Sequence, residues 1–494
     1  MTDRRPGTLR SAVFSVTVTV VVLVGLNALV ELLEDEGVVQ THRVEDRMLY
    51  QEEAIFEKVG DRFRSTPYAR DHMVNSSFAA DKGSRWRMFL LGASFAQGTP
   101  YDCCESDGRE SFGGISTWLR AQYGALFPSR EVEVINVAAG GTSSHRVVEV
   151  ARSVLPYQPD VLVVASCNNE GVLSPGTVAE QLHKLGGYRF LAKHLAPAPD
   201  PAERRYFTPQ HPDAEAVRKQ FQHNLEQVIE LTREAGVPLL LATLPVNLRY
   251  RGFEPGPVID DQRYASASGN CAEAVEAFHS GKLELGLARL EGCEGLPDIQ
   301  SWKGIARLRM GQFEQGRSEL EQLWGPCIAQ GVTHYFGGRF AEAVEALESC
   351  GDAAEALRWS GLARFELGEA ERARVELEQA AELNPRNRCR PSYNALIREL
   401  AAGSEHVHLL DLEAAAERAS PLGLPGPELF VDYCHMNWRG YGLMAEELRA
   451  ALQLAGSAPG WPVEGASLPL DVVAERQRLH PLPAPPGSPG PQTQ

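Results

Sequence analysis

The sequence predicts an α/β protein: a parallel sheet with helices on both faces, interrupted by an all-α repeat module and preceded by one transmembrane helix. Five short apolar runs are typical of buried strands, and helix-like stretches such as 214–235 separate several of them. This alternation is typical of a parallel sheet whose helices cover both faces. A series of similar helical segments lies before the last of the five runs and predicts the inserted module.

The first element is an uncharged apolar stretch, 11–30, whose length suits a helix that crosses a hydrocarbon core of about 30 Å. Basic residues precede it (Arg4, Arg5 and Arg10), and acidic residues follow it (Glu31, Glu34, Asp35 and Glu36). The positive-inside rule therefore predicts a cytoplasmic N-terminus (1–10), a membrane anchor (11–33) and an extracytoplasmic, periplasmic body. A cleavable signal peptide is the alternative, but its apolar core is normally shorter, and no Ala-x-Ala-like site follows. The charged stretch 34–84 is predicted to be a juxtamembrane helix and connector.

The predicted strands end at small or polar residues, at the sheet edge where open α/β proteins place ligands. The strands are 87–91, 132–137, 160–166, 238–244 and 406–412. Gly92-Ala93-Ser94 follows the first strand, and Cys167-Asn168-Asn169-Glu170 follows the third. The second strand leads into Ala138-Ala139-Gly140-Gly141, whose small residues let the backbone approach a substrate closely.

After the last predicted strand, Asp432 precedes His435 by three residues, just ahead of the helix-like stretch 438–452. This spacing can place a carboxylate against one imidazole nitrogen and leave the other nitrogen free to take a proton from a serine. Each residue also has an ordinary interpretation: Ser94 as a turn serine, Asn169 as a helix N-cap, and His435 as the partner of a nearby carbonyl. The joint order and spacing favour the catalytic interpretation, with Ser94 as the serine.

These four ordered blocks resemble the SGNH, or GDSL-like, hydrolases over about 85–247 and 406–452. The family's Gly-Asp-Ser block reads Gly92-Ala93-Ser94 here, and its Gly-x-Asn-Asp block reads Cys167-Asn168-Asn169-Glu170, while Asp-x-x-His is intact. The resemblance implies a flavodoxin-like sheet and acyl transfer. In that mechanism Ser94 attacks an ester carbonyl, His435 acts as general base and then general acid, and Asp432 orients the imidazole. The implied oxyanion donors are the Ser94 amide, the Gly141 amide and the Asn169 side chain.

Asn247 and Arg249 follow the fourth predicted strand at the base of the inserted module. With 142–146 and 168–170, they resemble a branch of the family that carries helical repeats before the last block. They are candidates for substrate binding, Arg249 through an acidic group of the substrate, although a surface salt bridge is the ordinary role of such an arginine. The insertion follows the ligand-bearing edge of the sheet, so the repeats are also a candidate lid over the active site.

The inserted module contains four similar helix openings that begin at turn-compatible glycines, at steps near thirty residues: Gly281, Gly311, Gly338 and Gly368. The unit from Trp359 to Pro385 resembles the tetratricopeptide repeat. We expect a degenerate array at 265–390, which divides the hydrolase-like domain into 85–264 and 391–455. Its concave face is a candidate site for a protein partner, although such arrays also serve as spacers or lids.

Nine cysteines are an odd number, so at least one is unpaired or pairs between chains. Each of two cysteine pairs, Cys271 with Cys293 and Cys327 with Cys350, brackets a predicted helical hairpin. Antiparallel helices bring such ends together, which predicts two disulfides in an oxidising compartment. The alternative is that these cysteines are small buried residues of a helical core. We expect Cys103, Cys104, Cys167 and Cys434 around the active-site edge, without an assigned pairing.

A formal charge of −17 and the lack of a basic patch argue against nucleic acid as a partner. We expect no metal or cofactor, because the sequence offers no phosphate-binding glycine loop and no metal-ligand cluster. The tail 456–494, rich in Pro and Gly, is predicted to be disordered. The sequence therefore predicts a membrane-anchored serine esterase that acts on O-acyl esters, for example acetyl groups of a cell-envelope glycan. The alternatives are an O-acyltransferase that uses the same residues, and a non-catalytic repeat scaffold for protein partners.

Overall fold

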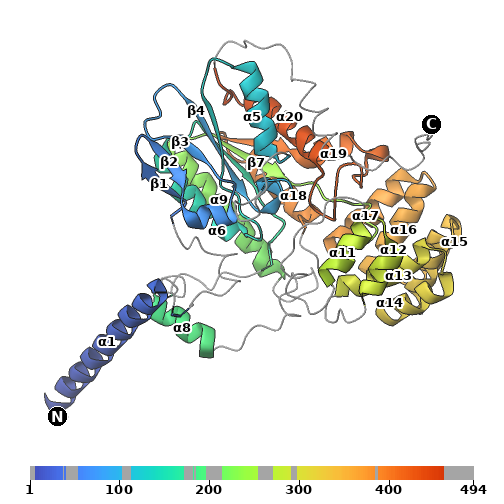
Figure 1. Cartoon of the computed structure of the whole chain (residues 1–494), viewed down its shortest axis with the longest axis horizontal. Coiled ribbons are helices and arrows are strands. Elements are labelled where there is room, and N and C mark those ends of the chain that lie inside the picture. Colours follow the sequence, from blue (N-terminus) through green and yellow to red (C-terminus); the bar gives the residue numbers. More distant parts are fainter. Residues whose placement is uncertain are drawn as a thin grey trace, which may run out of the picture. The chain divides into compact units, whose positions relative to one another are not determined.

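The computed structural model describes residues 6–36, 38–39, 54–102, 113–171, 182, 185–195, 214–253, 271–290, 297–383 and 388–460 (Figure 1). These residues fall into two units. The first unit contains α1 (Pro6–Asp35) and α8 (Gly186–Leu195), which pack on each other. The Gly187 amide donates to Asn27 Oδ1 at 2.9 Å, and Arg189 pairs with Glu34 at 2.8 Å.

The helix α1 contains one stretch, Thr17–Glu34, that is long and apolar enough to cross a membrane, with a mean hydropathy of 1.9. Because the stretch lies near the N-terminus, a signal sequence would satisfy the same criteria. The predicted anchor at 11–33 lies within this helix. Its orientation in a membrane remains a prediction.

The second unit begins with a three-stranded antiparallel sheet of β1 (Phe56–Val59), β2 (Arg62–Ser65) and β3 (Ser77–Ala79). The prediction of a helix and connector at 34–84 is therefore wrong for 54–84, where the only described helix is the short α3 (Pro67–His72). The sheet forms because its aromatic side chains have a place to pack. Phe56 and Phe78 lie 4.9 Å apart between ring centroids, and Phe78 lies 5.7 Å from Phe89 of the central sheet.

The central sheet is parallel and has five strands: β4 (Trp86–Gly92), β5 (Val132–Asn136), β6 (Val161–Ala165), β7 (Leu239–Thr243) and β8 (Val407–Asp411). They correspond to the five predicted strands. Their spatial order is β5-β4-β6-β7-β8, which is the flavodoxin-like order 2-1-3-4-5. The order reverses at β4, so the switch point where such sheets bind ligands lies at the carboxyl ends of β4 and β6.

Helices cover the sheet on two sides (Figure 1), with α5 (Ile115–Leu126) and α20 (Trp438–Leu454) on one face and α6 (Ser144–Val154) and α9 (Ala214–Ala235) on the other. Indole packing joins the first pair: Trp118 stacks on Trp438 at 6.2 Å and donates its Nε1 hydrogen to the Trp438 carbonyl at 3.0 Å. Two further helices, α18 (Pro391–Ala402) and α19 (Leu412–Arg418), flank β8 in the sequence. The two faces enclose the inner strands β4, β6 and β7, which are fully buried, whereas the outer strands β5 and β8 are partly exposed.

Seven described helices separate β7 from α18, and each packs on the next (Figure 1). They are α11 (Cys271–His279), α12 (Leu283–Arg289), α13 (Pro297–Arg309), α14 (Phe313–Phe336), α15 (Phe340–Glu348), α16 (Ala354–Glu366) and α17 (Ala370–Leu383). All four glycines of the predicted helix openings have a positive φ, between 72° and 78°. Each therefore makes the left-handed turn that ends one helix and lets the next begin.

These helices also repeat one packing contact. A Cβ atom added to Gly304, Gly331 or Gly361 would collide with a leucine sixteen residues later in each case (Leu320, Leu347 and Leu377). The leucine of one helix thus packs directly against the backbone of the helix before it, three times in succession. The tetratricopeptide likeness and the partner-binding face remain predictions.

A disulfide joins Cys327 to Cys350, the second pair that the spacing indicated, with a Cα–Cα distance of 5.7 Å. Cys271 is also disulfide-bonded. Its predicted partner Cys293 lies outside the described residues, as do Cys103, Cys104 and the predicted disordered tail from 461 onward. Cys167 bonds to Cys389, a pairing that the sequence did not suggest.

Candidate active site

Ser94 lies where β4 turns abruptly into the four-residue helix α4 (Ser94–Gln97). The turn depends on Gly92, which has a φ of 148° and whose absent Cβ would collide with the Ala165 carbonyl oxygen of β6. Ala93 is fully buried, whereas Ser94 is half-buried. The turn therefore carries the serine to the carboxyl edge of the sheet, at the switch point.

His435 and Asp432 reach this serine from the loop between α19 and α20. His435 Nε2 lies 2.7 Å from Ser94 Oγ, and His435 Nδ1 lies 2.8 Å from Asp432 Oδ2. The other carboxylate oxygen, Oδ1, accepts hydrogen bonds from the backbone amides of Cys434 at 2.8 Å and His435 at 2.6 Å. A carboxylate at Nδ1 favours the tautomer with hydrogen on that nitrogen, which leaves Nε2 able to accept the serine proton.

The electrostatics of this pair suit a charged intermediate. Burial acts to lower the pKa of His435, but the Asp432 carboxylate and the Cys434 side chain together outweigh burial and raise that pKa well above its usual value. For Asp432, burial acts to raise the pKa, while charged His435 and the hydrogen bonds it receives bring the pKa below its usual value. The pair is thus built to hold an imidazolium next to a carboxylate.

The two loops that carry the predicted oxyanion donors are tied to the serine's strand and to each other. The Ala139 amide donates to the Gly92 carbonyl at 3.1 Å, and the Thr142 hydroxyl, next to Gly141, donates to the Ala139 carbonyl at 2.9 Å. Asn169 donates from Nδ2 to the Thr142 carbonyl at 3.1 Å. Gly141 is exposed and has a φ of 72°, which a glycine adopts without strain. The structure therefore gathers the Ser94, Gly141 and Asn169 segments at one edge of the sheet.

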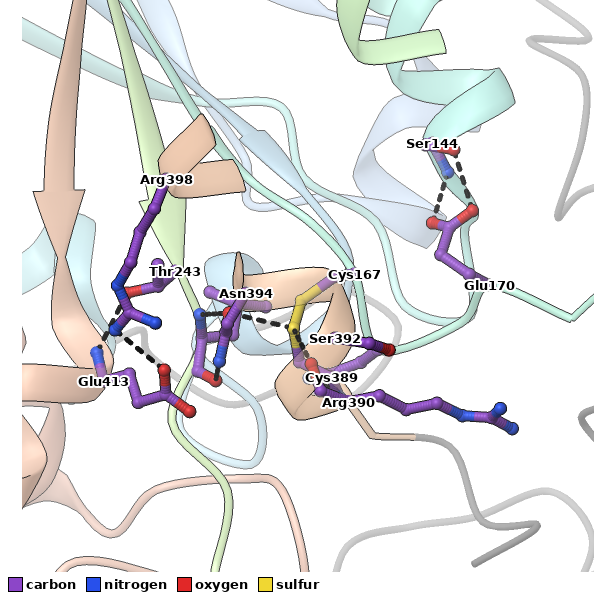
Figure 2. The surroundings of a disulfide bond; sticks show 12 residues. Ser144, Cys167, Glu170, Thr243, Cys389, Arg390, Ser392, Asn394, Arg398 and Glu413 are labelled. Carbon is purple, nitrogen blue, oxygen red and sulfur yellow. Dashed lines mark hydrogen bonds and ion pairs between the residues drawn. A yellow bond between two sulfur atoms is a disulfide. The ribbon is translucent and has the colours of Figure 1, made fainter. Parts of the chain in front are cut away.

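Glu170, the last residue of the third block, is buried and accepts hydrogen bonds from the start of α6. Its two carboxylate oxygens accept from the Ser144 amide at 2.8 Å and from the Ser144 hydroxyl at 2.7 Å (Figure 2). Ser144 begins α6, so Glu170 fixes the start of that helix beside the Asn169 loop. Burial raises the pKa of Glu170 to about 7, and the hydrogen bonds from Ser144 only partly oppose that rise.

The two residues that the sequence offered for substrate binding make contacts within the fold. Arg249 forms an ion pair with Glu428, donates to the Leu424 carbonyl at 2.8 Å and stacks over Phe365 of α16 at 4.4 Å, with its side chain only 12% exposed. Its guanidinium thus joins the inserted helices to the loop before Asp432. These contacts match the ordinary salt-bridge alternative, while a role of Arg249 in substrate binding remains a prediction. They also show that the insertion contacts the carboxyl edge of the sheet.

Asn247 is fully buried and donates from Nδ2 to the Asp432 carbonyl at 2.9 Å, while its backbone amide donates to the Tyr433 carbonyl at 3.1 Å. It therefore holds the loop that presents the catalytic carboxylate. Its position just after the fourth strand made Asn247 a candidate for the site. The sequence did not predict its hydrogen bond to the Asp432 carbonyl. The partners lie 185 residues further along the chain, so no local pattern pointed to them.

Cys434 is a free, buried thiol with its sulfur 3.5 Å from His435 Nδ1. Ligand atoms of Asp432, Cys434 and His435 lie within 4.8 Å of one another, as they could around a metal ion. Burial, however, raises the pKa of the Cys434 thiol, which disfavours the thiolate that metals bind. The hydrogen bonds among the same atoms fit a proton-transfer site better than a metal site.

The candidate active site does not lie in the cavity found along β5. A cavity of about 410 Å³ lies along β5 and is lined by residues that include Arg62, Arg120 and Arg130, but by none of Ser94, Asp432 and His435. The hydrogen-bond geometry identifies the candidate site instead.

Comparisons with known proteins add little to this geometry. No family model matches the chain, and no curated protein matches it. Among solved structures, one titled "Crystal Structure of TesA" is similar over 33% of this chain and 62% of that chain, at 15% identity and a TM-score of 0.20. A likeness this weak carries no functional weight, so the class of the site rests on the fold and the residues described above.

Proposed function

We propose that the chain is a serine esterase of SGNH type that acts on O-acyl esters through Ser94, His435 and Asp432. The observation that carries the proposal is the continuous line of hydrogen bonds from the Asp432 carboxylate through the His435 imidazole to the Ser94 hydroxyl. The location of this line at the switch point of a 2-1-3-4-5 sheet supports it further.

The chemistry follows from that geometry. His435 Nε2 takes the Ser94 proton as Oγ attacks the ester carbonyl, and the resulting imidazolium is stabilised by Asp432. The amides of Ser94 and Gly141 and the side chain of Asn169 would hold the developing oxyanion. Each such donor typically lowers the barrier by about 3 kcal/mol. His435 then gives its proton to the leaving alcohol, and water repeats the sequence on the acyl-enzyme.

We further propose that the catalytic unit lies outside the cytoplasm, anchored by α1. The positively charged N-terminus before the apolar stretch supports this orientation. The disulfides Cys327–Cys350 and Cys167–Cys389 support an oxidising compartment independently, because cytosolic thiols are normally kept reduced. An exposed envelope glycan bearing acyl groups, for example acetyl, is the substrate class that this location suggests.

Ester turnover by the full chain in detergent tests the proposal. We expect hydrolysis of p-nitrophenyl acetate by the wild type and its loss in Ser94→Ala. Ser153→Ala, which removes an exposed serine hydroxyl from α6, is the matched control and should keep wild-type turnover. Turnover that survives Ser94→Ala would overturn the assignment, and absence of turnover in the wild type would favour a repeat scaffold. Product analysis with an added sugar acceptor distinguishes hydrolysis from O-acyl transfer.

A further inference from the structure

The segment that closes the helical insertion is bonded covalently to the candidate oxyanion loop. Cys167 lies two residues beyond the end of β6, and Cys389 lies 222 residues later, just before α18. Their sulfur atoms form a disulfide with a Cα–Cα distance of 4.9 Å, and both residues are buried (Figure 2). The bridge joins the sheet to the end of the insertion at the point where the third sequence block begins.

A second contact fixes the same two segments. The side-chain oxygen of Asn168 accepts a hydrogen bond from the Cys389 backbone amide at 2.7 Å. The next residue, Asn169, donates to the Thr142 carbonyl at 3.1 Å and is only 4% exposed. Three consecutive residues thus have fixed partners: Cys167 and Asn168 on the side of Cys389, and Asn169 on the side of Thr142.

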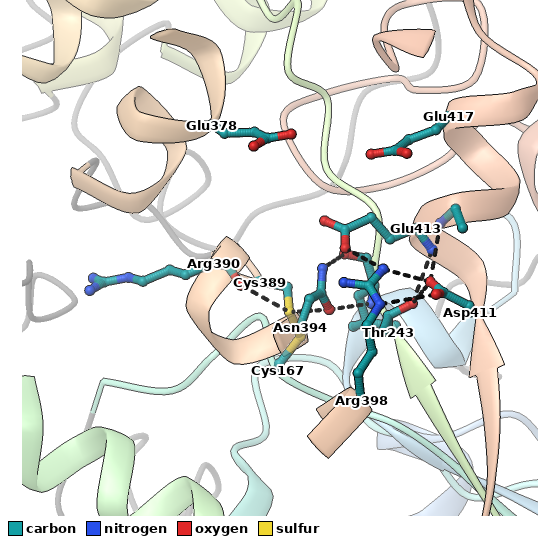
Figure 3. A network of polar contacts seen from close by, with 12 residues as sticks. Cys167, Thr243, Glu378, Cys389, Arg390, Asn394, Arg398, Asp411, Glu413 and Glu417 are labelled. Carbon is teal, nitrogen blue, oxygen red and sulfur yellow. Dashed lines mark hydrogen bonds and ion pairs between the residues drawn. A yellow bond between two sulfur atoms is a disulfide. The ribbon is translucent and has the colours of Figure 1, made fainter. Parts of the chain in front are cut away.

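Cys389 is itself part of a rigid junction. Asn394 lies in the first turn of α18, and Leu244 lies just beyond β7. The Asn394 side chain accepts a hydrogen bond from the Leu244 amide at 2.9 Å and donates one to the Leu244 carbonyl at 3.0 Å. Arg398 of the same helix binds Asp411 of β8 through two hydrogen bonds of 2.8 and 3.0 Å, in the polar network of Figure 3. The helix α18 is therefore fixed to the neighbouring strands β7 and β8, and it provides a stable point of attachment for the Asn169 loop.

The junction also reaches the insertion and the catalytic loop. Ser392 donates from its amide and its hydroxyl to Glu382 of α17, the last described helix of the insertion, at 3.0 and 2.7 Å. The Arg388 guanidinium lies 5.5 Å from the ring centre of Tyr433, the neighbour of Asp432. The segment 388–394 thus contacts α17, the Asn169 loop and the Asp432 loop.

We propose that the Cys167–Cys389 disulfide, together with Asn168, positions Asn169 for oxyanion binding, so that the end of the helical insertion determines the catalytic competence of the site. This inference rests on the proposed function. Its physical basis is that an oxyanion donor acts only when it is held at hydrogen-bond distance before the charge develops. A displacement of about 1 Å in an active site can reduce the rate about 10²-fold.

The bridge is a positioning element and not a participant in the reaction. The hydrogen bonds that link Ser94, His435 and Asp432 run among these three residues and do not pass through the bridge. Loss of the bridge should therefore lower kcat while substrate binding, and hence KM, changes little. A purely stabilising disulfide would instead lower the unfolding temperature and leave kcat unchanged well below that temperature.

The test compares full-length chains in detergent. In Cys167→Ser/Cys389→Ser we expect kcat for p-nitrophenyl acetate to fall about 10- to 100-fold, with KM within about threefold of wild type. Amide hydrogen exchange in the peptide that covers 166–170 should become faster. The matched control Cys327→Ser/Cys350→Ser removes a disulfide inside the insertion and should leave both quantities at their wild-type values.

Asn168→Ala provides a second, milder variant in case the double variant does not fold. It removes the hydrogen bond from the Cys389 amide and keeps the disulfide. We expect a smaller fall in kcat and a measurable increase in exchange at 166–170. If the double variant folds and keeps the wild-type kcat, the proposal is overturned. If the double variant does not fold, a wild-type kcat in Asn168→Ala overturns it. If the wild type hydrolyses no ester, the proposed function fails, and the exchange measurement still decides whether the bridge holds the loop: unchanged exchange overturns it.

Discussion

The buried carboxyl of Glu170 should make the folded chain less stable as the pH rises. Burial raises its pKa from the ordinary 4.5 to about 7, even though Ser144 donates two hydrogen bonds to it. A folded-state pKa above the unfolded-state value means that the folded chain holds this proton more tightly. The resulting stabilisation is complete below the unfolded-state pKa and is lost as the pH rises through the folded-state pKa.

The size of the effect follows from the two pKa values. A difference of about 2.5 pH units corresponds to about 3 kcal/mol, because each unit is worth about 1.4 kcal/mol. Replacement by glutamine keeps the shape of the side chain and removes the titration. Between about pH 4.5 and about pH 8, Glu170→Gln should therefore gain up to about 3 kcal/mol in free energy of unfolding relative to wild type.

Denaturant unfolding of the full chain, followed by tryptophan fluorescence at several pH values, measures this difference. Glu57→Gln, at an exposed position of β1, is the control and should follow the wild-type pH dependence. The reasoning about burial would be refuted if Glu170→Gln and wild type kept a constant difference in unfolding free energy across the range.

Three further predictions concern the catalytic unit and its location. The general base must be neutral, and Asp432 raises the pKa of His435 despite burial, so the ester hydrolysis rate should rise with pH through a pKa above about 6.5. Asp432→Asn should lower both that pKa and the rate, and a wild-type pKa below about 6.5 would contradict the electrostatic argument. Asn169→Ala should reduce kcat about 10²- to 10³-fold with little change in KM, and a loss confined to KM would argue against an oxyanion role. A reporter fused after Leu452 should be active only outside the cytoplasm, and activity inside would reject the predicted topology.

The central sheet could be predicted from the sequence because its strands are short continuous apolar runs that end at small residues. The helix boundaries of the insertion were also predictable from four glycines. Each of them has the positive φ that a turn between helices needs: Gly281, Gly311, Gly338 and Gly368. The contact between Asp432 and His435 was predictable because the two residues are neighbours in the sequence.

The remaining features depend on contacts between distant segments. The sheet of β1, β2 and β3 is stabilised by tilted and edge-on ring contacts with Phe89, which no pattern within 54–79 reveals. The bond between Cys167 and Cys389 spans 222 residues without any repeated spacing to indicate it. A salt bridge was the ordinary role expected of Arg249, but its partner Glu428 comes from a loop whose path only the folded chain defines.

The most direct test of the central claim is fluorophosphonate labelling of the full chain, with the modified residue identified by peptide mapping. Such a probe reacts with a serine that an adjacent base activates. If Ser94, His435 and Asp432 act as one unit, the wild type should be modified at Ser94, and labelling should be abolished both in Ser94→Ala and in His435→Ala. Labelling at another residue, or labelling of His435→Ala at the wild-type rate, would contradict the account.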